Sequence, residues 1–206
     1  MFKTISENTV AEIVEKKSKF IANIFYIESI EEAEKIIKEN KKKYFDARHN
    51  CYAFRVFTKE GIVDRFSDDG EPSGTAGSPM LNVLVSQNLN NILVIVTRYF
   101  GGILLGTGGL VRAYTGATIK ALESVSEINK DLGLEVRLDI SYSDFEKVKY
   151  YFNQNDIKIV DLNYSENVSI IVEITDEKLG ELVENKENIN FNIIKQEIIR
   201  EKYIQI

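Results

Sequence analysis

Three carboxylates lie within four residues, at Asp68, Asp69 and Glu71, in a loop that also carries Gly70 and Pro72. Carboxylate oxygens this close together could bind a hard cation such as Mg²⁺, or act as a general acid or base. The same pattern is typical of a tight turn whose acids are solvated or cap the next helix. The sequence leaves both interpretations open, and we assign no resident metal and no cofactor.

A second loop follows a strongly apolar run and is rich in glycine. Ten of the twelve glycines and both prolines lie between Gly61 and Gly116. Glycine at this density indicates positive φ angles or a close approach to the backbone. At Gly101–Gly109 a strand ends and a helix is expected to begin, so free N–H groups could bind an anion.

Two arginines flank this glycine-rich turn. Arg98 and Arg112 could hold a phosphate or carboxylate in a charged fork, or they could pair with the nearby acids and leave no open site. The turn is neither a Walker loop nor a correctly spaced dinucleotide fingerprint. The candidate ligand-binding residues are Arg98, Gly101, Gly102, Gly106, Thr107, Gly108, Gly109, Arg112, His49, Asp68, Asp69 and Glu71.

His49 is the only histidine and Cys51 the only cysteine. The histidine could titrate near neutral pH or simply form a hydrogen bond in a loop. The cysteine beside it suggests a nucleophile–base pair, but neighbouring strand residues point to opposite faces, which argues against that pair. A single cysteine excludes an internal disulfide and fits a reducing compartment. No catalytic residue is assigned.

The 206 residues are 44% hydrophobic and carry a net charge of −6. No apolar run approaches the roughly 18 residues that span a bilayer, so we expect a cytoplasmic protein that does not bind membranes. The charge is uneven: residues 1–130 are nearly neutral, whereas residues 131–206 hold 9 basic and 16 acidic residues. An acidic C-terminal part repels phosphate backbones, so any nucleic acid should bind the N-terminal part.

The elements that must position the two loops follow from hydrophobic periodicity. We predict a hairpin (10–14 and 20–27), a helix after the Ser29 capping box, strands at 52–57 and 62–66, and a helix over 80–85. The apolar run at 92–97 predicts a strand buried on both faces. After the glycine turn, residues 110–125 predict a helix.

A second domain is predicted after a short connection at Asp131–Gly133. Its pattern reads strand 134–141, helix 144–153, strand 157–164, strand 168–174, helix 176–184 and strand 192–199. This β-α-β-β-α-β order is the ferredoxin-like split motif. The predicted fold class is α+β, with an N-terminal domain over residues 1–130 and a ferredoxin-like domain over 131–206.

Several segments together resemble the YigZ/IMPACT family, in its bacterial two-domain form: Lys17–Phe20, Ala47–Ala53, Asp68–Gly77, Val96–Gly102 and Leu105–Tyr114. The resemblance covers residues 5–125 well and the second domain only by position and strand order. It implies an N-terminal α/β sandwich like the second domain of a small-subunit ribosomal protein. It also implies a C-terminal domain like the last domain of elongation factor G.

The resemblance also implies a function, because eukaryotic IMPACT proteins act in translational control. We therefore expect a non-enzymatic regulator whose N-terminal domain binds RNA, the ribosome or a translation-factor protein. The alternative is a protein or enzyme that binds a small anion, such as a phosphate or nucleotide, through Arg98, Arg112 and the glycine turn. A dipeptidase label used in the family gains little support from a single histidine. Nucleic-acid binding would need a local basic face, for which the candidates are Lys16, Lys17, Lys19, Lys41, Lys42, Lys43 and Arg48.

Overall fold

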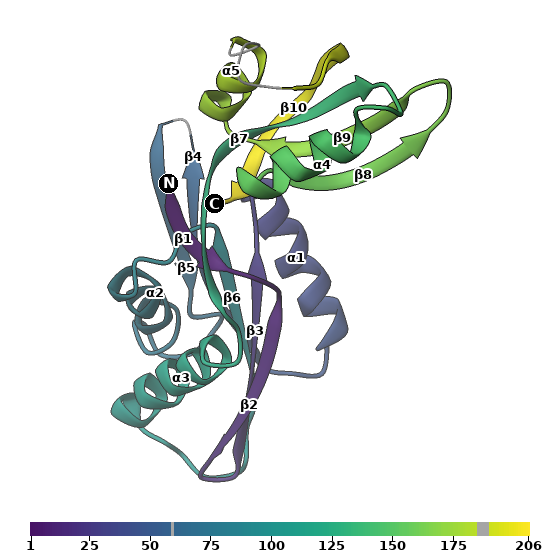
Figure 1. The fold of residues 1–206 in the computed structure, drawn as a ribbon. Helices are drawn as coiled ribbons and strands as arrows, with labels where there is room; N and C mark the ends of the chain where they lie inside the picture. Colours follow the sequence, from purple (N-terminus) through teal and green to yellow (C-terminus); the bar gives the residue numbers. More distant parts are fainter. Residues whose placement is uncertain (59, 185–189) are drawn as a thin grey trace. The chain divides into compact units, whose positions relative to one another are not determined.

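The computed structural model describes residues 1–58, 60–184 and 190–206 (Figure 1). The chain divides into an N-terminal unit, Phe2–Ile128, and a C-terminal unit of Asn129–Ile206 with Met1. The predicted α+β class with two domains is confirmed. Each unit is described separately.

The N-terminal unit is built on an antiparallel five-stranded sheet of order β2-β3-β6-β4-β5. Its elements are β1 (Phe2–Ile5), β2 (Thr9–Glu15), β3 (Ser18–Tyr26), α1 (Ile30–Lys43), β4 (His49–Thr58), β5 (Gly61–Ser67), α2 (Gly77–Ser86), β6 (Ile92–Tyr99) and α3 (Thr107–Leu122). The Ser29 hydroxyl accepts the Glu32 N–H and caps α1 as predicted.

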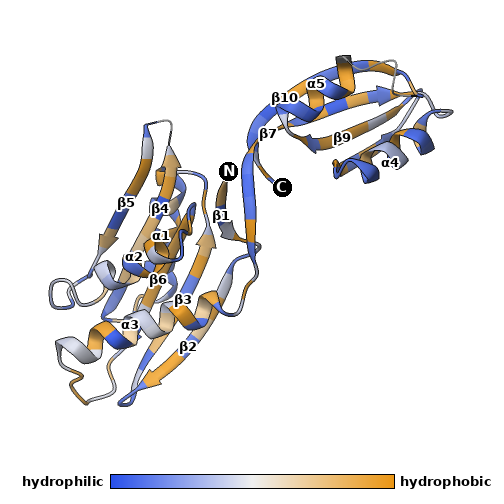
Figure 2. Cartoon of the chain, turned by 60° about the vertical axis from the view of Figure 1, so that its left-hand side comes forward, coloured by the Kyte–Doolittle hydropathy of each residue, from blue (hydrophilic) through white to orange (hydrophobic). Residues whose placement is uncertain are grey.

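β6 lies in the middle of this sheet, and its side chains alternate between two cores. Val94 and Val96 pack with α2 and α3, whereas Leu93 and Ile95 pack with α1. The all-apolar run was predicted to be buried on both faces, and seven of the eight residues of β6 are buried. Figure 2 shows long hydrophobic segments along the central strands β4 and β6.

The C-terminal unit has the predicted ferredoxin-like order. β7 (Glu127–Ile140), α4 (Phe145–Gln154), β8 (Lys158–Tyr164), β9 (Val168–Ile174), α5 (Asp176–Glu184) and β10 (Ile193–Gln205) form an antiparallel sheet of order β10-β7-β9-β8. Alternate residues of β7 and β9 share one core with both helices.

Four local predictions need correction. β1 was not predicted, because four residues carry too little periodic signal. The chain is held after this strand by the Ser6 N–H, which donates to the Ser126 carbonyl. α2 begins at Gly77, inside the predicted loop, and α3 begins at Thr107, inside the predicted glycine turn. The predicted connection at Asp131–Gly133 is part of β7, which pairs with β10 as far as Lys130 and Gln205.

Candidate binding pocket

One end of the N-terminal sheet brings the predicted site residues together. The register pairs His49 at the start of β4 with Arg98 near the end of β6, and Lys19 at the start of β3 with Tyr99. The acidic loop follows β5, which is the strand next to β4. Both loops singled out in the sequence therefore leave the sheet at the same end.

The carboxylates of Asp68 and Asp69 hold this loop in shape. Asp68 accepts the backbone N–H groups of Gly74, Ala76 and Gly77 at 2.8, 3.0 and 2.8 Å. It therefore fixes the turn that leads into α2, whose N-terminus has no other side-chain cap. Asp69 accepts the Asn50 N–H at 2.7 Å and pairs with Lys41 at 2.6 Å. Both carboxylates therefore have partners within the protein. The contacts of Asp68 agree with the alternative of a tight turn that caps the next helix.

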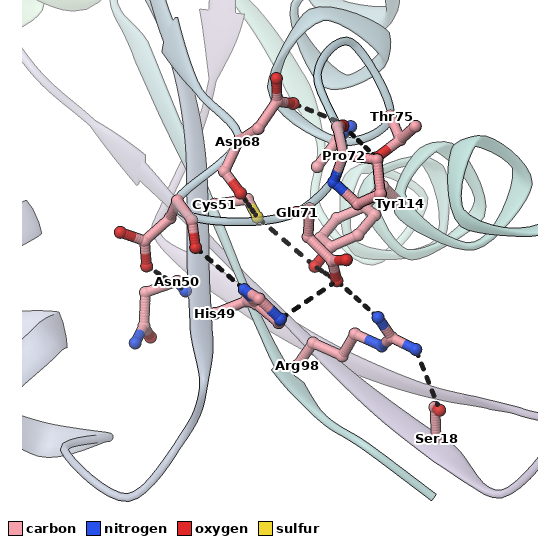
Figure 3. A network of polar contacts seen from close by, with 12 residues as sticks. Ser18, His49, Asn50, Cys51, Asp68, Glu71, Pro72, Thr75, Arg98 and Tyr114 are labelled. Carbon is pink, nitrogen blue, oxygen red and sulfur yellow. Dashed lines mark hydrogen bonds and ion pairs between the residues drawn. The ribbon is translucent and has the colours of Figure 1, made fainter. Parts of the chain in front are cut away.

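Glu71 forms a buried ion pair with Arg98 (Figure 3). The Arg98 Nη1 lies 2.6 Å from Glu71 Oε1, and the two side chains are only 7% and 3% exposed. The guanidinium also lies over the rings of Phe20 and Phe100, at 5.4 and 5.6 Å from their centroids. Arg98 thus ties the end of β6 to the acidic loop and to the core.

Tyr114 and Cys51 continue this polar network inward. The Tyr114 hydroxyl donates to Glu71 Oε1 at 2.9 Å, and the Cys51 thiol lies 3.4 Å from that hydroxyl and 2.9 Å from the Asp68 carbonyl oxygen. Burial raises the pKa of Cys51 to about 12, and burial also raises the pKa of Tyr114. A buried, protonated thiol is a poor nucleophile.

His49 lies between the acidic loop and the pocket. Its Nδ1 is 2.9 Å from the Asp69 carbonyl oxygen; because a carbonyl only accepts, Nδ1 carries the proton. Nε2 lies 4.0 Å from Glu71 Oε1. His49 and Cys51 are two positions apart on β4 and therefore share one face of the strand. The prediction that they point to opposite faces was wrong. Burial of the thiol is what disfavours a catalytic pair.

Glycines shape the second loop for different reasons. A Cβ on Gly101 would overlap the backbone of Lys17, so only glycine allows this loop to cross the β2–β3 turn so closely. Its N–H is donated to the Ser18 hydroxyl at 3.2 Å. Gly106, with φ of 72°, is the residue before α3, and Gly102 also has positive φ. Gly108 and Gly109 lie within the first turn of α3.

A pocket of about 390 Å³ opens beside this network. Among the predicted residues, His49, Glu71, Arg98, Gly106 and Thr107 line it. Arg48 and the apolar side chains were not predicted to belong to the ligand-binding site. The lining also includes Arg48, Pro72, Phe100, Leu104, Leu105 and Leu110.

Arg112 stands apart from Arg98. It is exposed on α3 and does not line the pocket, and its side chain makes no ion pair or hydrogen bond with the parts of the chain that the structure describes. Among the described residues, no group of three His, Cys, Asp or Glu side chains is arranged to hold a metal ion. Within the same residues, no helix is long and apolar enough to cross a membrane.

Comparison with known proteins decides the family. The sequence matches the Impact N-terminal domain over residues 16–122, more than half of the chain, and a domain of unknown function, DUF1949, over residues 138–184. It is 37% identical over 165 residues to IMPACT family member YvyE of Bacillus subtilis, covering 80% of this chain and 76% of the relative. The chain belongs to the IMPACT family.

Other comparisons agree with the IMPACT assignment. IMPACT family member YigZ of Escherichia coli is 37% identical over 174 residues, which cover 84% of this chain and 85% of the relative. A crystal structure described as that of a hypothetical protein is 31% identical, with a TM-score of 0.64, and covers 93% of this chain and 95% of its own. The family resemblance predicted from the five sequence segments is therefore confirmed.

Proposed function

We propose that this IMPACT family protein is a non-enzymatic regulator associated with translation. Its N-terminal unit would bind RNA, the ribosome or a protein of the translation apparatus, in the cytoplasm. The link to translation rests on the family resemblance. The unit itself contributes unpaired cations at the pocket end of the sheet, and this is the observation that carries the binding proposal.

The basic face anticipated from the sequence separates into paired and unpaired cations. Lys19 pairs with Glu12 and Lys41 with Asp69, both at 2.6 Å. In contrast, five exposed cations of this set form no ion pair with any residue described in the structure: Lys16, Lys17, Lys42, Lys43 and Arg48. Lys43 lies instead over the Tyr44 ring. Unpaired cations are free to displace counterions from a phosphate backbone.

The turn between β2 and β3 gives this proposal further support. Lys16 and Lys17 have φ angles of 45° and 66°. Consecutive positive φ angles suit Asn-Gly in a two-residue hairpin turn, whereas lysine is disfavoured there. Each strained residue costs on the order of 1 kcal/mol, and such strain is concentrated at functional positions. Lysine occupies both positions despite a conformational penalty, as expected if its charge is used.

The satisfied acids favour binding over catalysis. Asp68, Asp69 and Glu71 each form bonds to backbone or to buried cations. A general acid or base needs a carboxyl group that can exchange a proton with substrate. The second candidate, a small-anion protein that uses Arg98 and Arg112 as a fork, has less geometric support because Arg98 faces inward and Arg112 lies outside the pocket lining.

Co-sedimentation with ribosomes across a salt series tests the proposal. The triple variant Lys16→Asn, Lys17→Gly and Arg48→Ala removes three cations while suiting the turn geometry. We expect weaker binding, with a salt dependence whose slope falls by about 1 per lost cation. The matched control removes three ion-paired cations of the C-terminal unit: Lys147, Lys149 and Lys195. Equal binding of the triple variant and the wild type, or no binding of the wild type at low salt, would refute the proposal.

A further inference from the structure

We propose that the pocket of the N-terminal unit binds a small organic anion, in which a phosphate or carboxylate is joined to an apolar or aromatic group. This inference does not depend on ribosome binding. It rests on a cavity whose wall combines a large apolar surface, one unpaired cation and the first turn of a helix. A nucleic-acid backbone bound to the outer basic face would not need a cavity that combines these three features.

The apolar part of the ligand follows from the wall of the pocket. Phe100 and Leu104 line it although they are 50% and 81% exposed, while Leu105 and Leu110 are buried behind them. Exposed apolar side chains that rim a concave site commonly mark a binding surface. The volume of about 390 Å³ falls within the roughly 300 to 1,000 Å³ typical of small-ligand pockets.

The charge expected of the ligand depends on the ionic groups in the pocket lining that have no partner of opposite charge. Arg98 and Glu71 cancel one another at 2.6 Å. His49, whose Nδ1 donates to the Asp69 carbonyl oxygen, adds no negative charge. Arg48 is exposed, lines the pocket and forms no ion pair with any residue in 1–58, 60–184 or 190–206. The lining therefore carries a net positive charge, which favours an anion.

The backbone beside Arg48 supplies matching donors. Gly106 and Thr107 line the pocket at the start of α3, a helix of 16 residues. The first N–H groups of a helix have no partner within it and point toward an anion. Gly108, in the same turn, has neither positive φ nor any atom within 4 Å of an added Cβ. Packing does not require this glycine, although glycine is a weaker helix former than alanine. An unobstructed approach to these N–H groups would explain it.

Phenyl phosphate is the probe that combines both features, and NMR titration of the ¹⁵N-labelled full chain measures its dissociation constant. Inorganic phosphate supplies the anion alone and phenol the ring alone. We expect phenyl phosphate to bind about tenfold or more tightly than either, with the largest shifts at Gly106 and Thr107. Benzoate carries a carboxylate in place of the phosphate. Tighter binding of phenyl phosphate than of benzoate would assign a phosphate group to the ligand, and the reverse order would assign a carboxylate. Either order supports the proposal.

Two variants make the test specific. Arg48→Ala removes the unpaired cation and should weaken phenyl phosphate binding about tenfold, the loss expected for one charge-assisted hydrogen bond. Leu104→Ser removes apolar wall from an exposed position and should weaken phenyl phosphate but not inorganic phosphate. Arg65→Ala is the matched control, because Arg65 is an exposed arginine of the same unit that pairs with Glu34.

Four results would overturn the proposal. These are no saturable binding of phenyl phosphate or benzoate, inorganic phosphate binding as tightly as phenyl phosphate, Arg48→Ala binding like Arg65→Ala, and shifts that map away from the pocket. None of these results depends on ribosome binding, so this proposal and the proposed function fail separately.

Discussion

The buried pair of Arg98 and Glu71 gives the sharpest prediction about stability. In the Arg98→Met variant, the Glu71 carboxylate stays only 3% exposed and loses its counterion at 2.6 Å. Breaking a buried pair by removing one partner costs about 3 to 5 kcal/mol, because a buried charge is left uncompensated. That is a large part of the roughly 5 to 15 kcal/mol that stabilises a typical domain.

Glu71→Gln should cost less, about 2 kcal/mol, because an amide oxygen still accepts from Tyr114 and Arg98. The double variant removes both charges, and we expect it to be less destabilised than Arg98→Met alone. The coupling energy from this double-mutant cycle should be about 2 kcal/mol or more, as found for residues in one buried network.

Cys51 provides the assay for this unit alone. It is the only cysteine and is fully buried in the N-terminal core, so alkylation of its thiol in a urea series reports opening of this unit. The chain has no tryptophan, which makes fluorescence a weaker probe. A loss below about 1 kcal/mol for Arg98→Met, or a coupling energy near zero, would show that the pair is solvated and would refute the reasoning.

Three further predictions concern the two loops and the buried thiol beside them. Gly101→Ala should destabilise the unit by at least about 2 kcal/mol because its Cβ would collide with the Lys17 backbone, whereas Gly108→Ala, the control, should be neutral or stabilising by up to about 1 kcal/mol in urea unfolding. Asp68→Asn should cost about 2 kcal/mol, since one amide oxygen cannot accept the three N–H bonds, and a loss below about 0.5 kcal/mol would contradict that role. Because the pKa of Cys51 is raised from 9.0 to about 12, its contribution to stability is intact below pH 9 and is lost as the pH rises toward 12. Wild type should therefore lose about 1 kcal/mol more than Cys51→Ala between about pH 8 and pH 10, and equal losses would contradict the shift.

Strong periodic signals made much of the fold predictable from the sequence. The apolar run of β6 could only be a strand covered on both faces, and the β-α-β-β-α-β order identified the ferredoxin-like unit. The misses lie where local signals are weak. Glycines at 108 and 109 argue against a helix, yet α3 begins at Thr107 because its later turns pack into the core. Tertiary contacts override local propensity in such cases.

The composition of the site was predictable, and pairing of Arg98 with the nearby acids was one predicted alternative, but its partner Glu71 and the unpaired state of Arg48 were not predicted. Arg98, Glu71 and His49 were all predicted to belong to one site. The register of β4 and β6 brings His49 and Arg98 close, and Glu71 lies near both. No pattern could say that Arg98 turns inward while Arg48 stays unpaired, because that depends on side-chain direction and on burial. The Ala47–Ala53 motif held the missed signal, since Arg48 lies beside the one histidine.

A crystal structure with phenyl phosphate would separate structural from ligand-binding cations in one measurement. We expect the phosphate beside Gly106, Thr107 and Arg48, the ring against Phe100 or Leu104, and Arg98 still paired with Glu71. A phosphate bound by Arg98 with that pair opened, or bound outside the pocket, would refute the proposed division of roles between Arg98 and Arg48.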